Sequence, residues 1–382
     1  MTEEITITNI AYGGFGIGRI NGKTIFVDSA VPGDVLQIDI FRDAKNYSFA
    51  RQLSIIRPSP LRVQPECPNF GECGGCSYLN IDYTTEIDFK LKILTGLLQR
   101  IAGLSLDDIP EIDVITDSRF SYRSHAGIKI SGTRKGFYAG DSNSFVEFPV
   151  HGCRLLCDVL NDGIRKLKIY NDVREIKVAG DHFSGFIDSL NSPDAYVLEF
   201  DYNFKFRHDL SGFYQANINL REKMIQRVIE YASPGKNDVF MDICCGCGFF
   251  SLPLASVSGR GHGFDSDKRS IYNAVHNMRI NNIDNISFEV RAESGIHPHR
   301  YKPDFIVVDP PRNGISKNGK NTINAIKPSR LIYVSCDPST FARDAADFIK
   351  QGMQIKKITM IDMFPCTKHI ELIACFYADK KV

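Results

Sequence analysis

The feature that most constrains the fold is a series of short apolar segments, each followed by a helical stretch, from about residue 206 to the C-terminus. Continuous apolar runs of this length are typical of buried strands, and strands that alternate with helices build a doubly wound α/β sheet. The carboxyl ends of such strands share one edge, where ligands bind. Residues 206–382 are therefore predicted to form a doubly wound domain. The predicted strands are 238–243, 259–264, 286–290, 305–308, 331–334 and 370–376.

The strand ends carry residues suited to a nucleoside. Asp242 opens a D-x-x-x-G-x-G pattern that includes Cys244 and Gly246 and leads into a helix. Such a loop lets the backbone pass close to a nucleoside, and Asp265, at the end of the next strand, is placed to bind ribose hydroxyls. A dinucleotide enzyme is the rival interpretation, although the third glycine of its fingerprint is absent. A purely structural glycine turn is the other alternative.

A cysteine and a carboxylate near the C-terminus indicate a covalent reaction. Cys336 follows an apolar strand, and Glu371 lies later in the chain at the edge of another strand. A thiolate can attack a polarised ring carbon, and a base is then needed to release the adduct. Asp309, followed by two stiffening prolines, is predicted to line the same cleft. A lone cysteine after a strand is more often a small buried hydrophobe, so the pair depends on its context.

Residues 1–57 alternate short β-type runs with turn signals, which predicts a small barrel. The Asn-Gly pair at 21–22 is typical of a hairpin. The glycine-rich stretch 13–19, followed by 30–34, resembles a TRAM domain, an OB-like barrel that binds RNA. No helix follows these glycines, so a dinucleotide loop is rejected. The predicted strands are 6–8, 23–27, 35–40 and 49–53.

Residues 58–205 are predicted to form a β-rich central domain after a Pro/Cys/Gly-rich loop. Helices are expected at 82–102, with Ile101 on the apolar face, and near 153–168. Thiolates at the observed spacings can bind an iron–sulfur cluster or zinc, and unliganded thiols are the third possibility. Cys157 is a spare candidate for the fourth ligand. The preferred set is Cys67, Cys73, Cys76 and Cys153.

Composition excludes a membrane-spanning protein. Charged residues make up 24% of 382 positions, and no apolar run is long enough to cross a bilayer. The acidic N-terminus has no signal-peptide pattern, so eleven cysteines indicate metal or catalytic use rather than disulfides. We therefore expect a cytoplasmic protein. Basic and aromatic residues are interleaved in 118–140, which suits either RNA binding or a solvated sheet face.

Together these motifs resemble the RNA uracil-C5 methyltransferase family, in its TRAM-containing 23S rRNA type. The resemblance covers nearly the whole chain, and the order and number of its motifs argue against chance. It implies a Rossmann-like methyltransferase domain after the barrel and a β-rich Fe–S domain. The motifs are the barrel, the cysteine set, 213–217 in the F-x-Q-x-N position, the glycine loop 242–248, 309–312, 335–338 and 365–371.

The resemblance implies transfer of a methyl group from S-adenosylmethionine to C5 of a uridine, with 23S rRNA favoured and tRNA as the alternative. Cys336 is then the nucleophile on C6 of the uracil, and Glu371 removes the C5 proton. The target base is expected to flip out of its helix or loop. At the uracil the family pattern places Phe213, Gln215 and Asp309. At the cofactor it places Gln215, Asp242, Cys244, Gly246, Asp265 and Asp309.

The resemblance also implies a [4Fe-4S] cluster on the four cysteines, ahead of zinc. Its expected role is structural or RNA-positioning, because methyl transfer needs no electrons. We expect a monomer that binds RNA and no membrane. A cytosine-C5 methyltransferase and a non-catalytic RNA-binding Fe–S protein are the competing functions. Glu371 with His369, in place of a second cysteine arrangement, favours uracil over cytosine. Intact Cys336, Glu371 and Asp309 argue against a non-catalytic protein, and Cys366 is interpreted as a bystander.

Three positions depart from the family pattern. Cys244 stands where an aromatic residue is usual, and Phe249 where Asn is common. Ala292 occupies a position where Asn or Asp often closes the adenine pocket, and the neighbouring Glu293 is a candidate to replace it. His369 is interpreted either as an orienting residue for the glutamate loop or as a structural histidine.

Overall fold

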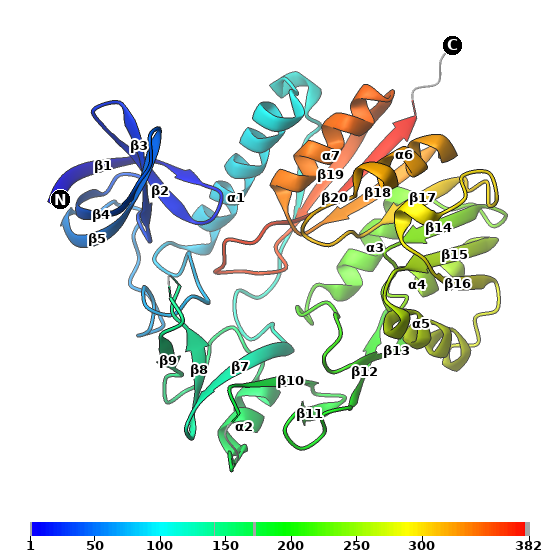
Figure 1. Cartoon of the computed structure of the whole chain (residues 1–382), viewed down its shortest axis with the longest axis horizontal. Coiled ribbons are helices and arrows are strands. Elements are labelled where there is room, and N and C mark those ends of the chain that lie inside the picture. The colour runs from blue at the N-terminus through cyan, green and yellow to red at the C-terminus, as the bar shows by residue number, and fades with distance from the viewer. Residues whose placement is uncertain (1, 141, 171–172, 379–382) are drawn as a thin grey trace.

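A computed structural model describes residues 2–140, 142–170 and 173–378 (Figure 1). The first five strands close into a barrel in the order β1-β2-β3-β5-β4. Its core contains inward-facing apolar side chains such as Ile5, Val27 and Leu36. The predicted barrel is therefore confirmed. Its strands are β1 (Thr2–Ala11), β2 (Phe15–Ile20), β3 (Lys23–Asp28), β4 (Val35–Asp43) and β5 (Tyr47–Arg57).

One barrel strand, β2, lies where the sequence predicts only a glycine-rich connection. Gly16 and Gly18 lie where neighbouring strands approach so closely that side chains are excluded. A Cβ at Gly18 would lie 2.5 Å from Ile5 Cδ1. Glycine inside a strand marks such a close approach, so the glycines here are part of a strand rather than breaks in it. The hairpin predicted at 21–22 is present, with φ of 50° and 81° as a type I′ turn requires.

The C-terminal half contains an eight-stranded sheet in the order β16-β15-β14-β17-β18-β20-β19-β6. Its first five strands in this order run parallel, whereas β20 is antiparallel to both β18 and β19. The predicted doubly wound sheet is observed, with β19 and β6 as additional strands. The bounds are β6 (Ile112–Ile115), β14 (Val239–Ile243), β15 (Arg260–Asp265), β16 (Ile286–Val290), β17 (Phe305–Val308), β18 (Arg330–Ser335), β19 (Met353–Ile361) and β20 (Glu371–Ala378).

Helices cover both faces of this sheet (Figure 1). Successive strand residues point to opposite faces, so Met241 packs with α1, α6 and α7, whereas Phe240 packs with α3 and α4. The continuous apolar runs in the sequence therefore reflect burial on both sides. The helices are α1 (Tyr83–Leu97), α3 (Arg221–Ala232), α4 (Ser251–Ala255), α5 (Lys268–Ile280), α6 (Lys317–Ile326) and α7 (Pro338–Lys350).

The central part is a five-stranded antiparallel sheet, in the order β11-β10-β7-β8-β9, followed by the β12–β13 hairpin. Helix α2 (Asp158–Lys166) packs on this sheet through Leu160 and Ile164. The strands are β7 (His125–Ser131), β8 (Arg134–Tyr138), β9 (Phe145–Glu147), β10 (Glu175–Asp181), β11 (Gly185–Asp188), β12 (Tyr196–Asp201) and β13 (Phe204–Asp209). The short turns are η1 (Leu98–Ala102), η2 (Leu106–Asp108) and η3 (Glu293–Gly295).

Part of the predicted central segment, 58–205, packs with the eight-stranded sheet. β6 pairs with β19, and α1 places Leu94 in the core beneath α7. Ile101, predicted on the apolar face of this helix, is 41% exposed, because the wider π-type turn η1 rotates the chain there. Within the described residues, no helix combines the length and apolarity that crossing a membrane requires.

Candidate active site

Four chemically active residues meet at one edge of the eight-stranded sheet. Because β14, β15, β17 and β18 run parallel, their carboxyl ends share this edge. Asp242 and Asp265 lie at the ends of β14 and β15, while Asp309 follows β17 and Cys336 follows β18. The strand order therefore brings together side chains that lie nearly a hundred residues apart in the sequence.

Glu371 reaches the same edge from the opposite direction. β20 lies beside β18 in antiparallel register, with Ser335 paired to Leu372. Continuing this register by one position sets Cys336 beside Glu371, the first residue of β20. Glu371 is buried and Cys336 is half-buried. The predicted nucleophile and base are thus neighbours on adjacent strands.

The site gathers acidic groups in a buried space. Burial, reinforced by Glu371 and Asp309 and opposed by Arg312, raises the pKa of the Cys336 thiol to about 12. Burial and Asp309 raise the pKa of Glu371 well above its ordinary value, again against Arg312. Burial and the charge of a neighbouring carboxylate raise the pKa of Asp309 to about 7. A thiol with a pKa of about 12 is almost entirely protonated near neutral pH, and only the thiolate is nucleophilic.

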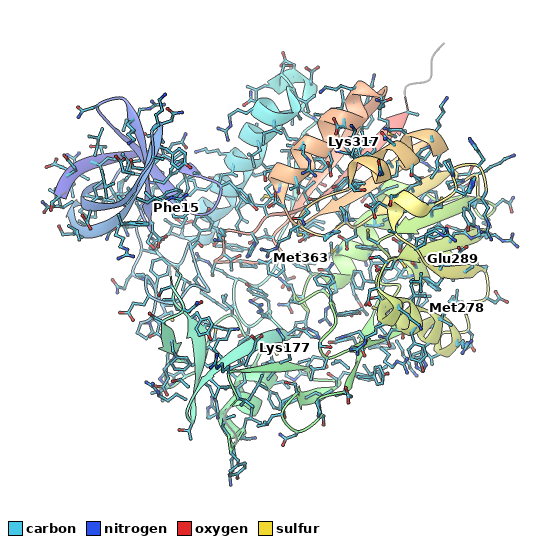
Figure 2. All side chains as sticks on the ribbon, in the orientation of Figure 1. Phe15, Lys177, Met278, Glu289, Lys317 and Met363 are labelled. Atoms are coloured by element: carbon cyan, nitrogen blue, oxygen red, sulfur yellow. The ribbon has the colours of Figure 1, made fainter. Side chains whose placement is uncertain are left out.

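The loop that precedes β20 is held by contacts with distant parts of the chain. Cys366 donates its backbone N–H to Glu86 Oε1 of α1 at 2.7 Å. The Cys366 carbonyl accepts the N–H of Ser77, next to the cysteine-rich loop, at 2.8 Å. Asn217 donates its side-chain amide to the carbonyl of Met363, labelled in Figure 2, at 3.1 Å. Cys366 is thus a buried structural residue of this loop, and the three contacts fix the segment that leads into Glu371.

The glycine loop after β14 leaves space and an unpaired acceptor at this edge. Cys244 and Gly246 have φ of 63° and 54°, and a Cβ at Gly246 would meet no atom within 4 Å. Asp265 Oδ2 accepts the Gly246 N–H at 2.9 Å. Buried Asp242 accepts a hydrogen bond from Ser251 at Oδ2, whereas its Oδ1 has no partner among the described residues. Open space beside an unsatisfied acceptor fits the nucleoside and amino group of S-adenosylmethionine.

The segment that contains Phe213 and Gln215 packs on the glycine loop through aromatic rings. The Tyr214 and Phe249 ring centroids lie 5.5 Å apart, and Phe249 is buried. Phe249 therefore departs from the family pattern as a core residue. Gln215 is buried, and its carbonyl accepts a bond from Arg221 Nε at 2.6 Å. The Phe213 side chain is 75% exposed, which leaves its ring accessible for stacking on a base.

The surroundings of Cys244 bear on whether Glu293 replaces the acidic residue that is missing at Ala292. Cys244 is half-buried, and burial raises its thiol pKa, with further contributions from Asp265 and Glu293. Glu293 is thus close to the glycine loop, where Ala292 supplies no polar side chain. The predicted replacement of the missing acid by Glu293 is consistent with this placement and remains a proposal.

The four preferred cysteines line one cavity of about 350 Å³. Cys76 and Cys153 also share an apolar cluster with Leu155 and with Cys366 of the glutamate loop. Cys157 points elsewhere, with its Sγ 3.4 Å from the Gly180 carbonyl. Among the described residues, no three of the cysteine sulfurs lie within 4.8 Å of one another. The structure therefore gathers the predicted set of four and separates the spare cysteine from it.

Several site residues were not assigned from the sequence. Tyr12 of the barrel donates its hydroxyl to Asp337 Oδ2, directly after Cys336, at 2.9 Å. Arg312 lies 3.5 Å from His369 Nδ1 and acts on the pKa of the thiol, and it follows the recognised D-P-P turn. Lys90 donates to two buried carboxylates near the loop before β20, Glu86 Oε1 at 2.8 Å and Asp362 Oδ1 at 2.6 Å. Lys90 could have been noticed in the sequence, because it is a charged residue on an apolar helix face. Nothing in the sequence around Tyr12 indicates its contact with Asp337.

The expected RNA-binding stretch is only partly available at the surface. In 118–140, Arg119 donates to the Tyr78 and Ile81 carbonyls and Lys135 to the Ile164 carbonyl, so both support the fold. The barrel carries exposed aromatic and basic groups instead, with the Arg51 guanidinium 4.9 Å from the centroid of Phe41. Such pairs suit stacking on single-stranded RNA.

Known proteins resemble this chain along nearly its whole length. Residues 196–377 match the tRNA (Uracil-5-)-methyltransferase family, and residues 1–53 match the TRAM domain. An uncharacterized RNA methyltransferase of Aquifex aeolicus is 30% identical over 97% of each chain. A 23S rRNA (uracil(1939)-C(5))-methyltransferase of Legionella pneumophila is 29% identical, covering 98% of this chain and 97% of the relative.

A solved structure shares the fold. The Pyrococcus abyssi tRNA (uracil-54, C5)-methyltransferase, in complex with S-adenosyl-L-homocysteine, superposes with a TM-score of 0.74 at 24% identity. The match covers 98% of this chain and 100% of the other. The resemblance inferred from the sequence motifs is thereby confirmed. This chain belongs to the family of S-adenosylmethionine-dependent RNA (uracil-C5) methyltransferases.

Proposed function

We propose that this enzyme methylates C5 of a uridine in 23S rRNA through a covalent bond between Cys336 and C6 of the uracil. The observation that carries the proposal is the β18–β20 pairing, which sets the Cys336 thiol beside the Glu371 carboxyl at the ligand edge of the sheet. The name of the Legionella relative supports 23S rRNA as the substrate.

The first step is addition of the thiol to the uracil ring. Because the pKa of Cys336 is raised to about 12, its proton leaves as the Sγ–C6 bond forms, and the Asp309 carboxylate accepts it, which leaves Glu371 free to act in the last step. The electrons of the C5–C6 double bond move toward C5 and O4. Arg312, whose charge already acts on the thiol and on Glu371, stabilises this developing negative charge.

S-adenosylmethionine, when bound, supplies an electrophilic methyl group. C5 of the uracil takes this group and becomes saturated, still bearing its hydrogen. Glu371 then removes that proton as a carboxylate, and its raised pKa makes it a stronger base once ionised. The Sγ–C6 bond breaks as the double bond returns. The products are 5-methyluridine, the regenerated Cys336 and S-adenosylhomocysteine.

The surrounding residues bind and orient the two reactants. We assign Asp265 to the ribose hydroxyls, and the unpaired Oδ1 of Asp242 to a donor of the cofactor. Gly246 leaves room for the cofactor, and Cys244 contributes through its backbone. Gln215 and Asp309 contact the cofactor or the uracil edge. Exposed Phe213 stacks on the flipped nucleotide.

The cysteine cavity fits an iron–sulfur cluster better than zinc. Four thiolates bound to one zinc ion at 2.3 Å lie about 3.8 Å apart. Cys67, Cys73, Cys76 and Cys153 line a cavity of about 350 Å³, and no three of their sulfurs, as described in the structure, lie within 4.8 Å of one another. We assign a [4Fe-4S] cluster to them with a structural role, because the adjacent Ser77 bonds to the loop that carries the base.

The reaction is tested with variants of the two central residues. Wild-type protein, Cys336→Ala and Glu371→Gln are incubated with a 23S rRNA fragment and S-adenosylmethionine, and 5-methyluridine is measured by nucleoside mass spectrometry. Both variants are expected to lose product, and only Glu371→Gln to accumulate a protein–RNA adduct that survives denaturing electrophoresis. Cys157→Ala and Glu111→Gln serve as matched controls. Product from Cys336→Ala would overturn the covalent mechanism.

The substrate is tested separately from the mechanism. Transcripts of 23S rRNA and of tRNA are offered to the same wild-type protein under identical salt, because RNA affinity depends on salt. Methylation of the rRNA supports the proposal. Methylation confined to the tRNA would overturn the choice of 23S rRNA and leave the roles of Cys336 and Glu371 in place.

A further inference from the structure

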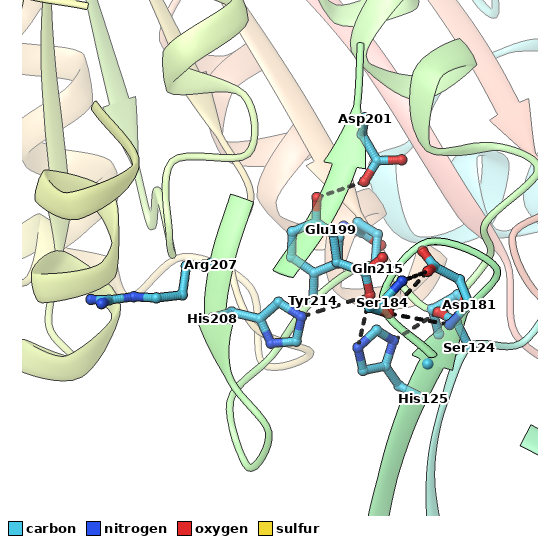
Figure 3. Close-up of polar contacts among 12 residues, drawn as sticks. Ser124, His125, Asp181, Ser184, Glu199, Asp201, Arg207, His208, Tyr214 and Gln215 are labelled. Carbon is cyan, nitrogen blue, oxygen red and sulfur yellow. Dashed lines mark hydrogen bonds and ion pairs between the residues drawn. The ribbon is translucent and has the colours of Figure 1, made fainter. Parts of the chain in front are cut away.

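A second group of reactive side chains lies away from the thiol, where the central sheet meets the β12–β13 hairpin (Figure 3). His125 begins β7, Glu199 is in β12 and His208 is in β13. One ligand atom from each lies within 4.8 Å of the other two. The exposed fractions of the three side chains are 14%, 0% and 2%, in that order. Each comes from a strand, so the backbone holds all three rigidly.

The hydrogen bonds of His208 determine which ring nitrogen is unprotonated. Its Nδ1 lies 2.9 Å from the Asp209 carbonyl, which can only accept. Nδ1 of His208 therefore carries the proton, and Nε2 of the neutral ring presents a lone pair. That Nε2 is buried without a hydrogen-bond partner among the described residues, 3.9 Å from Glu199 Oε1.

The same reasoning applies to His125. Its Nδ1 lies 2.8 Å from Ser124 Oγ, and the Ser124 hydroxyl also contacts the Ala216 carbonyl at 3.2 Å; we take the orientation in which the hydroxyl donates to that carbonyl. Ser124 Oγ also accepts a bond from Arg221 at 2.6 Å. Nδ1 of His125 is therefore the donor to Ser124, and its Nε2 lone pair faces Glu199 Oε1 at 3.4 Å.

Three lone-pair atoms thus converge without a donor between them. Glu199 Oε1 and both Nε2 atoms have no hydrogen-bond partner within the described part of the chain. Arg221 does not fill this role, because it bonds to the other carboxylate oxygen, Glu199 Oε2, at 2.8 Å. A buried acceptor without a partner is costly, and three that face one another repel, so the arrangement is suited to a bound cation.

We propose that His125, Glu199 and His208 bind a divalent transition-metal ion, with zinc the best fit. Two ligand atoms at 2.1 Å from zinc and at a tetrahedral angle lie roughly 3.4 Å apart, which matches the separation between His125 Nε2 and Glu199 Oε1. His208 Nε2 lies 3.9 Å from Glu199 Oε1 and would move closer on binding the ion. Each Nδ1–H is held by an oxygen acceptor, as is usual for metal-binding histidines. Asp181 interacts with Glu199 and is a candidate for a fourth ligand.

The ion would clamp the central sheet to the hairpin that leads into the active site. The His208 ring stacks on Tyr214 at 4.6 Å with an interplanar angle of 8°, and Tyr214 packs against Phe249 of the glycine loop. Gln215 follows directly in the chain. The ion therefore acts as a structural support for this segment, and the site itself does not depend on the proposed reaction.

Metal content and metal binding test the site. Full-length protein, purified without chelator, is analysed for zinc and iron by mass spectrometry, and Co²⁺ binding is followed by absorption. Wild type is expected to hold about one zinc or cobalt ion per chain at a site without thiolate charge-transfer bands. His208→Gln should lose this equivalent, and His299→Gln, at an exposed histidine, should keep it. Ser124→Ala should weaken Co²⁺ binding by about 10- to 100-fold.

A measurement on wild type alone covers the case in which His208→Gln does not fold. Crystals of wild type soaked in Zn²⁺ should show a zinc-edge anomalous peak among His125, Glu199 and His208. Absence of that peak would overturn the proposal. Equal Co²⁺ binding by wild type and His208→Gln would overturn it as well. Zinc found only at the four cysteines would do the same.

Discussion

The raised pKa of Cys336 leads to a quantitative prediction about its reactivity. With a pKa of about 12, the fraction of thiolate at pH 8 is about 10⁻⁴. An ordinary cysteine with a pKa of about 8.5 is about one-quarter thiolate at that pH. Cys336 therefore has about 2,000-fold less thiolate than an ordinary cysteine at this pH. The more basic thiolate is intrinsically about 40-fold more nucleophilic, so alkylation should be roughly 50- to 100-fold slower than for an ordinary thiol.

The assay is alkylation by iodoacetamide in the absence of RNA, followed by mass spectrometry of the Cys336 peptide. The same peptide in urea-unfolded protein provides the reference thiol. The rate for folded protein should rise about tenfold for each pH unit between pH 8 and pH 10, because only the thiolate reacts. The unfolded reference should level off above pH 9, since its thiol is then mostly ionised.

Two charge variants are expected to change the alkylation rate of Cys336 in opposite directions. Asp309 has a pKa of about 7, so at pH 8 it is about nine-tenths ionised and raises the pKa of Cys336. Asp309→Asn should therefore speed alkylation, and Arg312→Gln should slow it. Each unit of thiol pKa changes the net rate by about three- to fourfold. Alkylation of folded Cys336 at the rate of the unfolded reference at pH 8 would refute the reasoning. A change of the alkylation rate in the same direction in both variants would refute it as well.

Three further perturbations have definite expected outcomes. Lys90→Met removes the ammonium group that bonds two buried carboxylates, which leaves Asp362 without its ion pair and Glu86 with Arg119 only. It should lower the free energy of unfolding by about 3–5 kcal/mol, measured by urea titration; a loss below 1 kcal/mol would contradict the role of the buried ion pairs. Gly246→Ala and Gly132→Ala both place a side chain at positive φ in open space, so both should lose about 1 kcal/mol of stability. Only Gly246→Ala should raise the KM for S-adenosylmethionine, and an equal KM in both would exclude the loop from the cofactor site. Tyr12→Phe removes one charge-assisted bond to Asp337 and should lower the stability by about 1–2 kcal/mol and reduce kcat; unchanged stability and kcat would show that the bond is dispensable.

The sequence was sufficient for the architecture of the larger domain and for the prediction of which residues lie at its ligand edge. Continuous apolar runs indicate strands buried on both faces, and the residues directly after such strands fall at the ligand edge. Asp242, Asp265, Asp309 and Cys336 were found for this reason. The prediction failed where local pattern is ambiguous. β2 contains glycines that resemble a turn, and the π-type turn η1 exposes Ile101.

The sequence by itself determined the features that depend on neighbouring residues. These are the periodicity of strands and helices, the turn chemistry and the residue types at strand ends. Only the tertiary structure decided which distant segments meet. The antiparallel insertion of β20 beside β18 places Glu371 against the thiol, and the joining of β7 to the β12–β13 hairpin brings His125 toward Glu199. The physical reason is that pairing partners, burial and the resulting pKa shifts arise from the packing of the whole chain. No local pattern of side chains records that packing.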